Sequence, residues 1–129
     1  MAEPFDGKSI LIVDDDTDIL GAIEAVFKET GAQIMTATDG NTAVTMALEK
    51  NPDLLILDAM LPQRSGFLVL EKLKAKKPRG SKPYVIMITG NTGKRHQQWA
   101  ESLGADGYIN KPFRMERLVQ SAEALLAKG

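Results

Sequence analysis

The amino-acid sequence predicts an α/β fold: a (βα)5, doubly wound sheet of five parallel strands with helices on both faces. Five short apolar runs alternate along the chain with five stretches of helical periodicity. The runs are apolar throughout, as expected for strands that are covered on both faces. Consecutive parallel strands need a crossover connection, which a helix supplies, and right-handed crossovers dominate.

The first strand is expected at Ser9–Val13, a run rich in β-branched residues and too short for a buried helix. Asp15 or Asp16 can cap the helix that follows, because a carboxylate accepts hydrogen bonds from the free N–H groups of a first turn. Gly31 supplies a stop for this helix. Its apolar residues recur at helical spacing, at Ile19, Leu20, Ile23, Val26 and Phe27.

The second strand is expected at Gln33–Ala37 and the third at Leu54–Leu57. The helix between them follows a turn at Asp39–Asn41 and ends at the Asn51–Pro52 pair, since the residue before a proline disfavours helical geometry. A third helix opens after Gly66. The apolar positions of these two helices are Ala43, Val44, Ala47 and Leu48, then Phe67, Leu70 and Leu73.

Tyr84–Thr89 is the clearest strand, and Gly90–Gly93 separates it from a polar helix that carries Trp99 and Leu103. A brief fifth strand is expected at Gly107–Ile109. We find no internal repeat and no linker, and expect one domain over residues 1–129 with a core over about 8–127. The last helix has the sharpest apolar stripe, at Met115, Leu118, Val119, Ala122, Leu125 and Leu126.

Composition and charge exclude several classes of protein. The chain has 129 residues, with 16 Lys and Arg against 17 Asp and Glu, so no global charge draws it to nucleic acid or an anionic membrane. With no cysteine and one histidine, disulfide frameworks, thiolate nucleophiles and the common zinc sites are excluded. No apolar run approaches the ~20 residues of a membrane span, and the N-terminus does not resemble a signal peptide. We therefore expect a cytoplasmic protein without direct contact to nucleic acid or membrane.

Polar side chains gather where the predicted strands end. Ligands of open parallel sheets bind outside the carboxyl ends of the strands, so these side chains are expected at one rim. Four of the five strands contribute to the rim, with carboxylates, a hydroxyl, an amide and an ammonium group. The residues are Asp14, Asp15, Asp16, Asp58, Thr89, Gly90, Asn110 and Lys111.

The chemistry of this rim favours phosphoryl transfer. Clustered carboxylates are unfavourable without a cation, and an oxygen-only set suits a hard ion such as Mg²⁺. Lys111 and the Thr89 hydroxyl suit a phosphoryl group, one by its charge and the other by a hydrogen bond. A carboxylate beside Mg²⁺ can attack phosphorus and form an acyl phosphate. Each acidic residue taken alone can equally be a helix cap, but their conjunction at several strand ends favours a site.

Four motifs resemble the receiver domain of bacterial two-component response regulators, the chemotaxis-regulator-like family. They are ILIVDDD (Ile10–Asp16), LLILDAMLPQRSGF (Leu54–Phe67), VIMITG (Val85–Gly90) and GADGYINKPF (Gly104–Phe113). The resemblance covers essentially the whole chain and implies the flavodoxin-like receiver fold. It implies a signalling switch, not an enzyme in the usual sense, although the family catalyses its own phosphorylation and dephosphorylation.

The resemblance implies a role for each matching residue. Asp58 would accept a phosphoryl group from a sensor histidine kinase or a phosphotransfer protein. Asp14, Asp15, Asp58 and the backbone carbonyl of Met60 would hold Mg²⁺ or Mn²⁺, with Asp14 acting through a water molecule. Lys111 would pair with an oxygen of the phosphoryl group.

The same resemblance implies how a signal would leave the site. The Thr89 hydroxyl and the Gly90 N–H would donate to the phosphoryl group, and Tyr108 would move inward as Thr89 turns. This movement would change the surface formed by the fourth helix, the fifth strand and the fifth helix. A downstream output domain or protein would bind that surface. The bond between Lys111 and Pro112 is expected to be cis.

Some positions depart from the family's usual pattern. Gly90 stands where alanine is common, and Met60 and Asn91 occupy the two variable positions beside the site. The segment Arg117–Ser121 replaces the acidic-Leu-x-x-Arg pattern that supports a dimer in winged-helix regulators. This difference argues against that dimer and leaves a monomer or a weak dimer open.

An enzymatic alternative is a haloacid-dehalogenase-like phosphatase with Asp14 as its nucleophile. Its Asp-x-Asp-x-Thr/Val signature fails at Asp18, and the chain leaves no room for a cap domain. Three remaining features have structural interpretations. His96 is expected to be a solvated surface residue, and Trp99 to pack partly against its own domain. A solvated face and loop is expected for the basic run Lys72, Lys74, Lys76, Lys77, Arg79 and Lys82.

Overall fold

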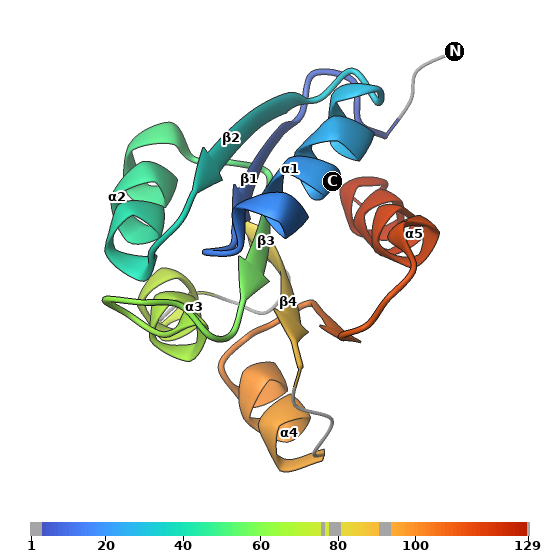
Figure 1. The fold of residues 1–129 in the computed structure, drawn as a ribbon. Coiled ribbons are helices and arrows are strands. Elements are labelled where there is room, and N and C mark those ends of the chain that lie inside the picture. The colour runs from blue at the N-terminus through green and yellow to red at the C-terminus, as the bar shows by residue number, and fades with distance from the viewer. Residues whose placement is uncertain (1–3, 76, 78–80, 91–93, 129) are drawn as a thin grey trace.

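Five parallel strands form one sheet in the order β2-β1-β3-β4-β5 (Figure 1). The structure, a computed structural model, describes residues 4–75, 77, 81–90 and 94–128. Strands and helices alternate along the chain, which confirms the predicted (βα)5 doubly wound fold. The elements are β1 (Ser9–Val13), α1 (Thr17–Lys28), β2 (Gln33–Ala37), α2 (Gly40–Lys50), β3 (Leu54–Asp58), α3 (Gly66–Lys74), β4 (Tyr84–Thr89), α4 (Lys94–Ser102), β5 (Gly107–Asn110) and α5 (Met115–Leu126).

Successive side chains of each central strand point to opposite faces of the sheet, so each strand contributes to two cores. Ile10 and Ile12 of β1 pack with Phe27 and the other apolar residues of α1 and α5. Leu11 and Val13 pack into the second core, with apolar residues of α2, α3 and α4. Figure 1 shows this division, with α1 and α5 on one side of the sheet and α2, α3 and α4 on the other. Both faces are therefore buried, which is why the strands are apolar throughout.

The register of the sheet aligns the carboxyl ends of its central strands. Val13 lies opposite Leu57 in the β1–β3 pair, so the residues that follow, Asp14 and Asp58, leave neighbouring strands at the same level. In the β4–β5 pair, Thr89 lies opposite Asn110. The predicted polar rim is thus a direct consequence of the parallel register.

Short polar side chains start the first three helices. Asp16, and not the alternative Asp15, caps α1 by accepting hydrogen bonds from the backbone N–H groups of Asp18 (3.0 Å) and Ile19 (3.3 Å). Asp39 and Ser65 cap α2 and α3 in the same way. These bonds satisfy donors that have no partner within a helix.

Some details differ from the sequence-based expectations. The third and fifth strands are each one residue longer, ending at Asp58 and Asn110. Leu48, expected on the buried face of α2, is 58% exposed, because the buried face of this helix is centred on Gly40, Ala43 and Ala47 and Leu48 lies at its margin. His96, expected to be a solvated surface residue, is partly buried, and its ring tilts against Phe67 with 5.9 Å between the ring centroids.

Lys74 is the clearest correction. It was expected on a solvated face, but it is 6% exposed. Its ammonium donates to the carbonyl oxygens of Ser81 (2.6 Å) and Pro83 (3.0 Å) and pairs with Asp106 (3.2 Å). Lys72 on the same helix is exposed, as predicted, and so are Lys77 and Lys82. Lys76 and Arg79 lie outside the described residues.

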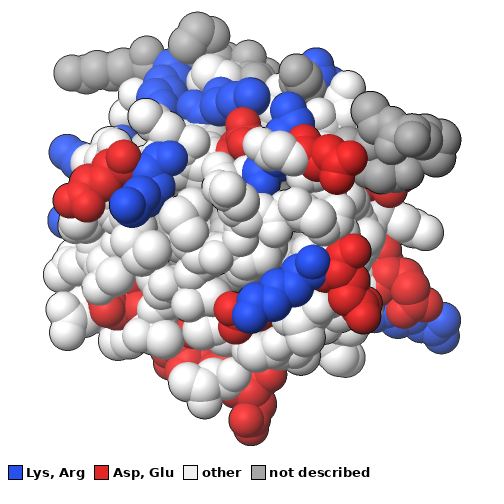
Figure 2. All heavy atoms as spheres, turned by 90° about the horizontal axis from the view of Figure 1, so that it is seen from above, with Lys and Arg blue, Asp and Glu red and all other residues white. Residues whose placement is uncertain are grey.

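Charged side chains of both signs are interspersed on the surface seen from above the fold (Figure 2). Uncharged residues separate most of them, which agrees with the near balance of 16 basic and 17 acidic residues. Among the residues that the structure describes, no helix is both long and apolar enough to cross a membrane.

Replacing Lys74 by methionine is expected to lower the free energy of unfolding by about 3 kcal/mol, because it leaves the Asp106 carboxylate and two carbonyl oxygens without their cation. Urea unfolding followed by circular dichroism measures this change. Lys72→Met is the matched control on the exposed face of α3 and should change stability by no more than about 0.5 kcal/mol. Equal effects of the two variants would contradict a structural role for the buried ammonium group.

Candidate functional site

The site begins at the end of β1, where three consecutive aspartates face different surroundings. The Asp14 side chain is buried, and its Oδ1 accepts a hydrogen bond from the Asp16 N–H at 2.9 Å. The Asp14 N–H donates to the carbonyl of Ala37 at 3.2 Å, which continues the strand pairing by one residue. Asp15 is exposed, and Asp16 serves α1 as its cap. Of the three, Asp14 and Asp15 are therefore available to a ligand.

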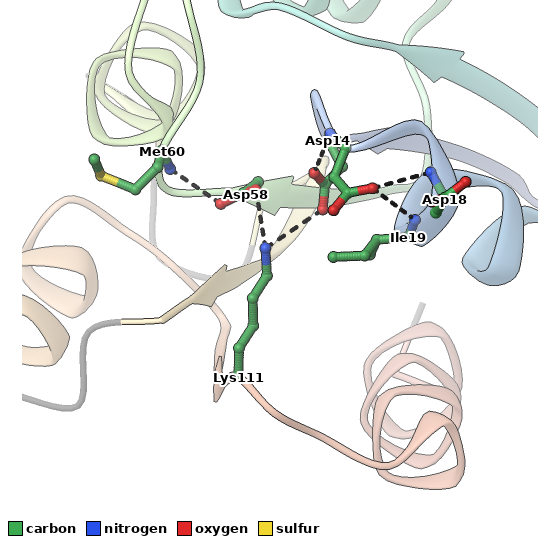
Figure 3. A network of polar contacts seen from close by, with 7 residues as sticks. Asp14, Asp18, Ile19, Asp58, Met60 and Lys111 are labelled. Atoms are coloured by element: carbon green, nitrogen blue, oxygen red, sulfur yellow. Dashed lines mark hydrogen bonds and ion pairs between the residues drawn. The ribbon is translucent and has the colours of Figure 1, made fainter.

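Asp58 ends β3 and is 5% exposed. Its Oδ1 accepts a hydrogen bond from the backbone N–H of Met60 at 3.0 Å (Figure 3). Gly66 packs directly beneath: a Cβ on this residue would lie 2.2 Å from the carbonyl oxygen of Asp58. The Gly66 N–H donates to the carbonyl of Ala59 at 2.9 Å. The connection from β3 to α3 therefore folds back tightly beside the Asp58 carboxylate.

The carboxylates of Asp14, Asp15 and Asp58 converge. One oxygen from each lies within 4.8 Å of the others. This set contains only oxygen donors, which suits a hard divalent cation and not a soft metal. The predicted acidic cluster is thus assembled at the carboxyl ends of two neighbouring strands, β1 and β3.

Lys111 supplies the positive charge of the cluster. Its Nζ lies 3.1 Å from Oδ2 of Asp58 and 3.7 Å from Oδ2 of Asp14 (Figure 3). Burial lowers the pKa of the Lys111 ammonium, but the hydrogen bond and charge of Asp58 and the charge of Asp14 outweigh this effect and raise it. The bond between Lys111 and Pro112 is cis, as the family resemblance implied.

The pKa of Asp14 is raised to about 6. Burial is the largest cause, since it penalises the charged carboxylate, and the neighbouring Asp58 charge acts in the same direction. The Asp16 N–H and the Lys111 ammonium oppose the shift without cancelling it. Without a further cation, the site therefore holds one carboxylate at a free-energy cost.

Thr89 and Tyr108 form the third side of the site. Thr89 is buried at the end of β4, and its carbonyl accepts the Lys111 N–H at 2.7 Å. Burial raises the pKa of the Tyr108 hydroxyl, while a side-chain hydrogen bond with Thr89 lowers it, and the net shift is upward. Gly90 follows Thr89 and is exposed. Asn91, the second variable position, lies outside the described residues.

Two contacts around the site have partners that the sequence analysis did not identify. Trp99 of α4 stacks on Phe67 of α3, with ring centroids 4.3 Å apart and planes 7° apart. Gly40, the first residue of α2, packs against the backbone of Arg64 in the loop that follows Asp58. Trp99 was expected to pack against its own domain, but only the structure identifies its partner, and no local pattern marks Gly40.

Comparison with known proteins agrees with this geometry. The chain matches the family model of the response regulator receiver domain over residues 10–123. It is 33% identical over 120 residues to the probable transcriptional regulatory protein TcrX of Mycobacterium tuberculosis. That alignment covers 93% of this chain and 50% of TcrX, so the chain spans about half the length of this relative.

Solved structures of receiver domains are also similar to this chain. The receiver domain of the Francisella response regulator 1452 superposes with a TM-score of 0.86 at 25% identity, covering 95% of this chain and 98% of that one. The receiver domain of the sensor histidine kinase PA1611 of Pseudomonas aeruginosa PAO1, which was crystallised with a magnesium ion in its active-site cleft, gives 0.81 at 25% identity. This alignment covers 94% and 98% of the two chains. Sheet order, acidic cluster and sequence match together show that the chain belongs to the response regulator receiver domain family of two-component signalling proteins.

Proposed function

We propose that this domain is a phosphorylation-controlled switch in which Asp58 accepts the phosphoryl group from a histidine kinase or a phosphotransfer protein. The observation that carries the proposal is the position of the Asp58 carboxylate, held between the carboxylates of Asp14 and Asp15 and the ammonium of Lys111. Membership of the receiver family supports it. The proposal concerns the switch alone, because the chain spans about half the length of its relative TcrX.

The donor set fits a divalent metal ion. Asp14, Asp15 and Asp58 would hold Mg²⁺ or Mn²⁺, and the backbone carbonyl of Met60 would add a neutral oxygen. The magnesium ion in the related Pseudomonas receiver domain supports this assignment. Bound there, the metal ion would neutralise carboxylate charge and polarise phosphoryl oxygens.

The remaining steps depend on the residues of the chain. An oxygen of the Asp58 carboxylate attacks the phosphorus of a phosphohistidine, the P–N bond breaks, and the histidine nitrogen keeps the electron pair and takes up a proton. Lys111, already 3.1 Å from Asp58, pairs with the charge of the phosphoryl group. The Thr89 hydroxyl and the Gly90 N–H donate hydrogen bonds to its oxygens. Loss of the group to water regenerates the carboxylate.

The Thr89–Tyr108 hydrogen bond suggests how the signal leaves the site. A phosphoryl group on Asp58 competes with Tyr108 for the Thr89 hydroxyl, which frees the Tyr108 ring to move. Tyr108 lies in β5, beside α4 and α5, so its movement alters the α4-β5-α5 surface. An output domain or protein would bind that surface, and contact with nucleic acid would occur only through such an output domain.

The phosphatase alternative places the nucleophile at Asp14. The family match favours Asp58 instead. The two assignments predict different essential aspartates, which makes them separable by one substitution series.

Asp58→Asn is expected to abolish Mg²⁺-dependent labelling by a small acyl phosphate such as acetyl phosphate, because an amide does not form the acyl phosphate. Mass spectrometry of the intact protein, with loss of the label in hydroxylamine, measures the reaction. Asp18→Asn makes the same change on the exposed first turn of α1 and should label like the parent. Labelling that survives in Asp58→Asn but disappears in Asp14→Asn would assign the nucleophile to Asp14.

Asp14→Asn is expected to stabilise the metal-free protein by about 1–2 kcal/mol at pH 8. The folded-state pKa of Asp14, about 6, lies above the ordinary value of 3.8. The cost of its charge is therefore fully present above pH 6 and is relieved as the pH falls toward 4. The gain should shrink at pH 5, as measured by urea unfolding in EDTA.

The same variant should bind Mg²⁺ at least about tenfold more weakly, because it loses a charged donor. Isothermal titration calorimetry at pH 8 measures this affinity. A variant that is less stable than the parent at pH 8, or that binds Mg²⁺ equally well, would contradict the electrostatic account of the site.

A further inference from the structure

We infer that Gly40, on α2, is a positioning residue for the metal site, because its lack of a side chain sets the path of the loop that follows Asp58. The inference rests on the proposed function, since it concerns the Met60 backbone carbonyl as a metal ligand. Gly40 itself touches neither the carboxylates nor Lys111. Its influence passes through residues 60–64 of the β3–α3 loop.

The contact between Gly40 and the loop is closer than any side chain permits. A Cβ on Gly40 would lie 1.9 Å from the carbonyl oxygen of Arg64, 2.7 Å from its carbonyl carbon and 2.6 Å from its Cβ. Two of these three atoms belong to the backbone, so a rotamer change of Arg64 does not relieve the overlap. A methyl group at position 40 must therefore displace the loop backbone.

The glycine is not needed for its own backbone conformation. The positive-φ glycines among the described residues are Gly7, Gly31 and Gly104, and Gly40 is not one of them. Gly40 is the first residue of α2, where alanine is a better helix former than glycine. Close approach of the loop is the remaining physical requirement for glycine here.

Two hydrogen bonds hold the tip of the loop at the start of α2. The Gly40 N–H donates to the Pro62 carbonyl at 3.2 Å, and the Asn41 side-chain amide donates to Oε1 of Gln63 at 3.3 Å. The Pro62 carbonyl also accepts the Arg64 N–H at 2.8 Å, which closes a tight turn. The tip is thus fixed to α2 from two adjacent positions.

The base of the loop is fixed as well. The Gly66 N–H donates to Ala59, and Gly66 leaves no space between itself and the Asp58 backbone. A displacement at the tip is therefore absorbed between these anchors, by the residues that include Met60. The Met60 N–H bonds to Asp58 and its carbonyl is the proposed metal ligand, so both contacts change with the loop.

Gly40→Ala is expected to raise the Kd for Mg²⁺ about tenfold, the lower end of the range for residues that support metal ligands. Isothermal titration calorimetry measures it, at a temperature where circular dichroism shows the variant fully folded. Gly21→Ala is the matched control: Gly21 is an exposed helical glycine of α1 with nothing within 4 Å of an added Cβ. The control should keep the parent's affinity.

Labelling by acetyl phosphate separates positioning from general damage. In Gly40→Ala the Mg²⁺ concentration for half-maximal labelling should rise by the same factor, while the rate at saturating Mg²⁺ stays within about twofold of the parent. A purely structural defect would lower the rate at every Mg²⁺ concentration.

If Gly40→Ala does not fold, Asn41→Ala tests the inference in its place. This substitution removes the hydrogen bond to Gln63 without adding bulk, and it should raise the Kd for Mg²⁺ about twofold. Parent-like Mg²⁺ binding in both variants would overturn the inference and leave the proposed function intact. Failure of the parent itself to bind Mg²⁺ would instead refute the proposed metal site.

Discussion

The structure is organised around two carboxylates that are buried side by side. Asp14 and Asp58 leave neighbouring strands at the same level, and like charges withdrawn from water are unfavourable unless cations accompany them. Lys111 forms ion pairs with both carboxylates, yet the pKa of Asp14 is still raised to about 6. The carboxylates at this edge of the sheet therefore carry an electrostatic cost that a bound metal ion would reduce. The two apolar cores supply the stability that permits this arrangement.

Local sequence was sufficient to predict the five strands to within one residue, because apolar runs act over a few positions. It failed where distant segments decide the environment. The local sequence places Lys74 among several exposed lysines, but carbonyl groups from the next loop and the Asp106 carboxylate surround its ammonium group. Leu48 fits the helical stripe of α2, but it lies at the margin of the face that the helix buries and remains exposed.

The candidate site shows the same division between local and distant information. Its charged residues were predictable, since parallel strands bring their carboxyl ends to one edge whatever the details of packing. The supporting contacts were not. Gly40 carries no mark of its role in the sequence, because its backbone conformation is ordinary and the crowding comes from Arg64, twenty-four positions later. Residues that position a metal ligand through contacts with a distant loop can be identified only from the three-dimensional structure.

Trp99 is the single tryptophan of the chain, and it stacks on Phe67 while remaining 48% exposed. Indole emission is sensitive to ring contacts and to water, so the intrinsic fluorescence of this protein reports one specific junction, between α3 and α4. Phe67 follows Gly66, which packs on the Asp58 backbone. The domain therefore carries a built-in optical probe of α4, linked to the Asp58 backbone through Phe67 and Gly66, that can be read without any label.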